Sequence, residues 1–399
     1  MAITGADLSK LQKIVYKDKD INLLPSSAII QKLFPLSGDK PGRSINMPVM
    51  VKASQGATYT NNGVASYVDD VAAVFQEASV VPYEIIMHDY LSLNDASAMA
   101  DSAGAYRKGS AQIFKQLLES HAFRAEMALY YASSVKGIMD VSSVAGQVIT
   151  ITTASWSAST ARRLLGASIE VFTEAGAQQN ATLVVASVQL AARTLTVTGT
   201  CSSVTSAGRI FFLGSRLKDG VGIDKIATNV GSMQGIDAAV YPDWAGQAYA
   251  VGSVQLSRQK ALEAAALGYG AGYEGDYYLF CSITAAQYLA DNEAALTRHK
   301  GSDSEKVSGA SEIRWLGVGG DIIVTPHPYC KDGDAHLVPK DSFEIIGNAK
   351  PGFTIPGSDP AELFILSETK TAFKLQTYSK MTGFSTNPNH FVKLTGIVN

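Results

Sequence analysis

Residues 43–52 read RSINMPVMVK, and the interpretation of the chain starts from this stretch. Apolar side chains occupy every second position of it, as a half-buried β-strand requires. These residues are Ile45, Met47, Val49 and Val51. A second strand-like run covers residues 71–87, and the polar stretch between the two contains the turn-favouring pair Asn62-Gly63. We therefore predict a long two-stranded β arm within residues 37–90.

A two-stranded arm of this kind is marginally stable alone in water, because nothing of its own covers its apolar face. We expect that face to pack against another copy of the chain. The residues expected at this contact come from the first strand and from the polar tip: Ile45, Met47, Val49, Val51, Tyr59, Asn61 and Asn62.

A long Ala-rich helix is predicted after the arm, with Asn94 or Asp95 as its cap and Gly137 as its stop. Its apolar residues recur at steps of three and four: Phe114, Leu118, Ala122, Ala125, Leu129 and Ala132. A helix from Asp101 would be roughly 50 Å long at 1.5 Å per residue, which is comparable to the diameter of a domain. Taken alone, this helix fits the core of an α+β enzyme equally well.

Residues 146–216 change in character and are predicted to form an inserted small all-β domain, a barrel or a sandwich. Short strands are expected between clusters of Gly, Ser, Thr and Asn, at residues 148–151, 168–172, 183–185, 195–197 and 209–213. The segment has few charges and no clustered histidines or carboxylates. A structural or display role is therefore favoured over catalysis.

From Leu217 the pattern becomes α/β. Helices are predicted at residues 254–267 and 284–296, and strands at 277–280, 321–325, 336–338 and 343–346. The remaining sequence is again β-prone, at residues 363–366 and 372–378. The fold class is therefore α+β.

Composition excludes several classes of protein. The 399 residues carry 33 Lys and Arg against 36 Asp and Glu, so the overall charge favours neither a nucleic-acid binder nor a membrane-surface protein. The three cysteines are odd in number and widely spaced, which suits a reducing compartment. No apolar run is long enough for a signal peptide or a membrane span, so we expect cytosol-like surroundings and no membrane contact.

Motifs for chemistry are sparse. The nucleotide-loop, zinc-protease and α/β-hydrolase signatures are absent from the sequence. Residues 327–336 (HPYCKDGDAH) place imidazole, thiol and carboxylate groups close together, so a metal-dependent enzyme using His327, Cys330 and His336 is one alternative. The Asp332-Gly333-Asp334 stretch is equally an ordinary hairpin turn. We predict a structural loop, no metal, no cofactor and no catalytic residue.

The order of these elements resembles the major capsid protein of tailed bacteriophages, the Johnson or Hong Kong ninety-seven type fold. Residues 222–226, 235–237, 241–246 and 316–324 are similar to stretches of such coat proteins. The resemblance implies an N-terminal arm, an extended E-loop, a peripheral domain with a long spine helix, an inserted β domain, an axial α/β domain and a β segment that returns to the peripheral domain. Their ranges would be 1–36, 37–90, 91–145, 146–216, 217–350 and 351–399.

The resemblance also implies a function. The chain would be a non-enzymatic coat protein that self-assembles, as hexamers and pentamers, into an icosahedral shell around double-stranded DNA. Assembly would occur in the host bacterial cytoplasm with scaffolding, portal and decoration proteins as partners. Residues 1–43 hold seven basic residues and four acidic ones, so Lys10, Lys13, Lys17 and Lys19 are expected to face the genome. An encapsulin-like shell around protein cargo is the other alternative.

Overall fold

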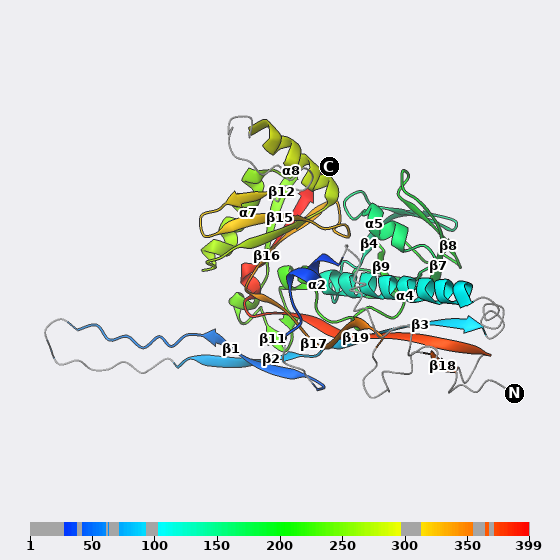
Figure 1. Ribbon diagram of the computed structural model, residues 1–399. Helices are drawn as coiled ribbons and strands as arrows, with labels where there is room; N and C mark the ends of the chain where they lie inside the picture. The colour runs from blue at the N-terminus through cyan, green and yellow to red at the C-terminus, as the bar shows by residue number, and fades with distance from the viewer. Residues whose placement is uncertain are drawn as a thin grey trace, which may run out of the picture.

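The computed structural model describes residues 28–37, 42–60, 63, 72–92, 103–296, 313–353, 364–366 and 371–398. Figure 1 shows four parts: a projecting two-stranded arm, a long antiparallel sheet with a helix lying along it, a small barrel, and a second sheet with helices packed on it. No helix among the described residues is long and apolar enough to cross a membrane.

The arm consists of β1 (Ile45–Lys52) and β2 (Val74–Val80), paired antiparallel from Ile45 opposite Val80 to Lys52 opposite Val74. The sequence predicts one strand over residues 71–87, and this prediction is wrong in one respect: the structure has two strands there. Pro82 has no N–H to donate to a ladder, so pairing with β1 ends before it. The chain continues as β3 (Tyr83–Ser92), which belongs to the long sheet.

The long sheet is built around a single central strand, β19 (Ala372–Ser385). β3 pairs along one edge of β19, from Ala372 opposite Ser92 to Met381 opposite Tyr83. Two strands share the other edge, β17 (Phe343–Gly352) and β18 (Phe364–Leu366). The segment that runs through β19 therefore holds together strands from three distant parts of the sequence.

The helix α4 (Ala103–Tyr131) packs on β19 and β3. Its predicted apolar face is confirmed, because the six residues named from the sequence are all buried. The predicted stop at Gly137 is wrong, since the helix ends at Tyr131. Ser133 has a left-handed φ of 55°, and its N–H donates to Asp219 instead of continuing the helix. The predicted caps Asn94 and Asp95 lie outside the described residues.

The predicted small β domain is a closed barrel. Its strands, in order around the barrel, are β4 (Met139–Ala145), β5 (Val148–Ile151), β8 (Thr194–Thr198), β7 (Gln178–Gln189), β6 (Ser168–Phe172) and β9 (Arg209–Phe212). All five predicted strands are confirmed. The barrel closes where Met139 of β4 pairs with Ile210 of β9, so its first strand precedes the boundary predicted at residue 146. A short helix, α5 (Ala158–Arg163), lies between β5 and β6.

The second sheet has six strands. Their order is β12 (Gln247–Val254), β20 (Val392–Ile397), β16 (Asp334–Pro339), β13 (Tyr277–Cys281), β15 (Asp321–Pro326) and β14 (Arg314–Leu316). α7 (Arg258–Gly270) and α8 (Ile283–Leu296) bury small residues against it. The helix predicted over residues 254–267 starts too early, because β12 extends to Val254 and the Ser257 side chain caps α7.

The two sheets exchange strands across the boundary predicted at residue 350. β20 lies after that boundary but pairs between β12 and β16 of the six-stranded sheet. β17 begins before the boundary but pairs with β19 of the long sheet. Short elements pack where the parts meet: α2 (Ile29–Leu33), α6 (Ile223–Ala227), β10 (Ser232–Met233), β11 (Ile236–Asp237), η1 (Pro242–Trp244) and η2 (Pro388–His390).

Candidate interaction surfaces and buried polar sites

The inner face of the arm packs on the chain's own core. Ile45, Met47, Val49 and Val51 are half-buried there, and they alternate with exposed residues as the sequence predicts. Two hydrogen bonds fix β2 at this base: Ser79 N–H donates to Gln234 O at 2.7 Å, and Gln76 Nε2 donates to the Tyr241 hydroxyl at 3.1 Å. We expected this apolar face to be covered by a second copy of the chain, but the chain's own core already covers it in part.

The outer face of the arm carries an apolar pair that the sequence analysis missed. Met50 and Phe75 lie directly opposite each other in the β1–β2 ladder, and they are 58% and 62% exposed. Tyr59, further along the arm, is 95% exposed. The available signal was Met50 itself, which puts an apolar side chain at a position that the alternation assigns to solvent. Asn61, Asn62 and the lysines at positions 10, 13, 17 and 19 lie outside the described residues.

The three side chains of the metal-site alternative are buried and already have partners. His327 Nε2 lies 3.1 Å from Glu126 Oε1, and His336 Nε2 lies 3.0 Å from Asp224 Oδ1. The Tyr130 hydroxyl lies 2.9 Å from His336 Nδ1 and 3.2 Å from Cys330 Sγ. No three His, Cys, Asp or Glu side chains in the described parts of the chain converge as a metal site would require.

Glu126 is a buried acceptor that joins α4 to α2. Its Oε1 accepts from the Ile30 N–H at 2.6 Å, and its Oε2 accepts from Gln31 Nε2 at 3.1 Å. With His327, three donors from two segments of the chain surround one carboxylate. Glu126 and His327 are fully buried. These hydrogen bonds therefore replace the ones that water would make to the carboxylate and to its donors.

A second buried group is centred on Asp224 of α6. Lys393 Nζ of β20 lies 2.6 Å from Asp224 Oδ1 and 3.0 Å from Asp334 Oδ2, and Ser134 donates to the other oxygen of Asp224. Burial alone would raise the pKa of Asp224, but the charge of Lys393 and the hydrogen bond to His336 hold this pKa well below its usual value. Burial alone would lower the pKa of Lys393, but the charges of Asp224 and Asp334 raise this pKa above its usual value. Both residues are therefore ionised at neutral pH.

His121 fixes α4 to the centre of the long sheet. Its two ring nitrogens each lie 2.7 Å from a hydroxyl on β19, Nδ1 from Thr377 and Nε2 from Ser379. Burial, and the nearby charge of Arg124, lower the pKa of His121 to about 4. The imidazole is therefore neutral at pH 7, and it pairs with the two hydroxyls as donor and acceptor.

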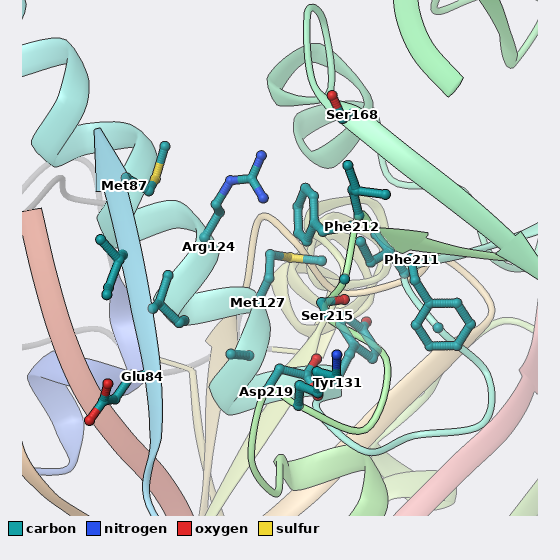
Figure 2. A pocket seen from close by; sticks show the side chains of 18 of the residues that line it. Glu84, Met87, Arg124, Met127, Tyr131, Ser168, Phe211, Phe212, Ser215 and Asp219 are labelled. Carbon is teal, nitrogen blue, oxygen red and sulfur yellow. The ribbon is translucent and has the colours of Figure 1, made fainter. Parts of the chain in front are cut away.

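A cavity of about 580 Å³ lies between α4, β3 and the β9 side of the barrel (Figure 2). Its walls combine polar and apolar groups. The apolar side chains include Met87 from β3, Met127 from α4, and Phe211 and Phe212 from β9. Arg124 enters it from α4 with its guanidinium carbon 4.4 Å from the centre of the Phe212 ring. The cavity thus lies between two of the four parts of the fold, the long sheet with its helix and the barrel.

We compared the sequence and the fold with those of known proteins. No protein-family model and no curated protein matches the sequence. Among solved structures, the capsid of cyanophage A-1(L) aligns with a TM-score of 0.57 and 11% identity over 94% of this chain and 93% of that one. The chain has the fold of a phage capsid protein. Two further matches are the native GTA particle capsid (TM-score 0.49, 10% identity, 100% of both chains) and Mycobacterium phage Adephagia (TM-score 0.45, 10% identity, 100% and 99%).

The buried charged sites could not be recognised from the sequence. Glu126, Asp224 and Lys393 look like surface residues in the sequence, because burial of a charge depends on partners from distant elements. Asp224 does lie in one of the stretches similar to coat proteins, residues 222–226, but that similarity carried no role for it. A turn is present at Asp332-Gly333-Asp334, since the Asp334 N–H donates to Lys331 O at 3.2 Å. The predicted hairpin is wrong, because β16 pairs with β13 and β20 and not with β15.

Proposed function

We propose that this protein is the major capsid protein of a tailed bacteriophage, a non-enzymatic subunit that self-assembles into an icosahedral shell around double-stranded DNA. The observation that supports this most is the fold, which aligns over nearly the full length of this chain and of a cyanophage capsid protein. Hexamers and pentamers of the subunit would form the shell. Scaffolding, portal and decoration proteins are the expected partners, and the host cytoplasm is the expected place of assembly.

The arm would act as the main link between subunits. Figure 1 shows it extending away from the rest of the chain, so its outer face has no partner among the described elements. Burying a side chain such as Met50 or Phe75 contributes on the order of 1.5 to 3 kcal/mol before ordering costs. Every subunit repeats the contact, so a modest energy per arm accumulates around a closed shell.

The first test separates folding from assembly. Replacing residues 53–70 with a short Gly-Ser linker should leave circular dichroism close to native and prevent closed shells, seen by sedimentation and electron microscopy. Phe75→Ser should weaken shells without touching the inner face of the arm. Val230→Ser is the matched control, because Val230 is 79% exposed but lies outside the arm. Full-sized, equally stable shells from both the linker variant and Phe75→Ser would exclude this role for the arm.

The second test addresses what the shell encloses. The basic residues Lys10, Lys13, Lys17 and Lys19 would neutralise phosphates without reading sequence, so their replacement by Gln should reduce genome packing and make it more sensitive to salt. Particles treated with nuclease should retain protected DNA. Particles that instead retain only protein cargo would favour the encapsulin-like alternative over a phage capsid.

A further inference from the structure

The cavity between α4, β3 and the barrel is lined by a cation, Arg124, that has no acidic partner among the described residues. Arg124 is partly buried. Burial lowers its pKa, and no carboxylate of the described residues offsets that cost. Figure 2 shows the side chain between Met87 and Phe212, with Met127 beside it. The stem is therefore packed while the charged end meets the open space.

The two acids of the cavity wall are engaged elsewhere. Glu84 pairs with Lys380, whose Nζ lies 3.1 Å from Glu84 Oε1. Asp219 accepts the Ser133 N–H at 3.3 Å, and burial raises its pKa to about 7. Lys218, at the rim, is exposed and adds a second positive charge. The cavity therefore combines apolar side chains in its wall with one guanidinium, that of Arg124, which has no carboxylate partner among the described residues.

We propose that this cavity binds a carboxylate carried on an aromatic or other apolar group. A guanidinium presents two parallel N–H groups that match a carboxylate, and this pairing gains strength when water is excluded. Met87, Met127, Phe211 and Phe212 would surround the apolar body of the ligand. The volume lies within the range of small-ligand sites, roughly 300 to 1,000 Å³. The carboxylate can belong to a free small molecule or to an acidic side chain of another copy. The inference does not rest on the proposed function.

The test uses 3-phenylpropionate as the probe and its uncharged amide, 3-phenylpropionamide, as the matched control. The full chain carries ¹³C-methyl methionine, so the Met87 and Met127 methyl signals report on the cavity and the exposed Met50 signal serves as an internal reference. The acid should shift the Met87 and Met127 signals with millimolar affinity and leave Met50 unchanged. The affinity of the amide should be lower than that of the acid by at least about tenfold, because the amide lacks the charge-assisted pair.

Two variants connect the effect to Arg124. Arg124→Met keeps the packed stem and removes the charge, so it should reduce acid binding to the level of the amide. Arg124→Lys keeps the charge but loses the fork, so it should bind with intermediate affinity. Met87 and Met127 signals that stay sharp and dispersed in the free variants, beside the one signal added by Arg124→Met, establish that the cavity is intact. Equal binding of acid and amide, or acid binding that survives in Arg124→Met, would overturn the proposal, as would unchanged Met87 and Met127 signals.

Assembled particles identify the source of the carboxylate. If an acidic side chain of another copy fills the cavity, the probe should bind dispersed subunits and be excluded from particles. If the natural ligand is a free molecule, subunits and particles should bind the probe alike. Both results require the same carboxylate site.

Discussion

Glu126 and Ile30 are joined by a hydrogen bond of 2.6 Å between the Glu126 carboxylate and the Ile30 N–H, although 96 positions separate them in the chain. This bond, with the one from Gln31 Nε2, attaches α2 to the C-terminal part of α4. Because α2 has only five residues, it cannot be stable without such a support. The first described segment of the chain is therefore held in place by one buried carboxylate.

The first prediction concerns this carboxylate. Glu126→Gln keeps the shape of the side chain but removes its charge, so it weakens its hydrogen bonds to Ile30, Gln31 and His327. We expect a loss of about 1 to 3 kcal/mol in the free energy of unfolding, measured with denaturant. Hydrogen exchange should accelerate at residues 29–34. Glu119→Gln, on the more exposed side of α4, is the control; equal effects of the two changes would contradict the support of α2 by Glu126.

The second prediction concerns pH. The pKa of His121 is about 4 in the folded protein and about 6.5 in an unfolded chain, so the unfolded state takes up a proton first on acidification. The free energy of unfolding should fall between pH 6.5 and pH 4, by up to about 3 kcal/mol from this group. His121→Gln should show a flatter dependence in denaturant titrations across that interval. His88→Gln, at an exposed position of β3, should keep the original slope.

The third prediction concerns Lys393. Lys393→Met removes the cation that offsets the burial of Asp224 and Asp334, so the free energy of unfolding should fall by about 3 to 5 kcal/mol. Adding Asp224→Asn should restore part of the loss, because the unpaired buried charge is then gone. Lys374→Met, at a partly exposed position of β19, is the control. If the double variant is less stable than Lys393→Met, then Lys393 does not stabilise the fold by offsetting the buried charge of Asp224.

The fourth prediction concerns the barrel. Residues 138–215 contain all six of its strands, whereas residues 146–215 lack β4, which leaves β5 and β9 with unpaired edges. Expressed alone, the longer segment should give dispersed amide resonances in NMR spectra. The shorter segment should aggregate or give collapsed spectra. Dispersed spectra from both segments would mean that β4 is dispensable for closure.

Local patterns predicted the elements of this fold better than their pairing. The barrel strands were found because clusters of turn residues separate short apolar runs, and the buried face of α4 because its apolar residues follow the helical repeat. The residues of β4 were missed because its stretch MDVSSVA alternates weakly. The position of β20 in the six-stranded sheet could not be predicted, since a strand's own sequence does not say which distant strand it joins.

The candidate sites divide in the same way. The half-buried face of the arm was predicted from alternation, and its exposed pair was not, because only the alternating apolar face was considered and Met50 was not. The roles of Glu126 and Asp224 were out of reach, since each depends on donors from several elements that only the folded chain brings together. His327 and His336 stood out in the sequence, and the structure gives each a single carboxylate partner.

The barrel has one property that follows from how it closes. The chain enters it at Met139 of β4 and leaves it through β9, and Met139 is the direct neighbour of Ile210 across the β4–β9 pair. A guest domain whose own ends lie side by side could therefore replace the barrel without stretching the host on either side. The host would have to satisfy two backbone N–H groups afresh, because Asp332 and Gly333 now donate to Trp156 and Ala154 on the barrel. With those two groups satisfied, this position would let one subunit present many different cargoes in a repeated array.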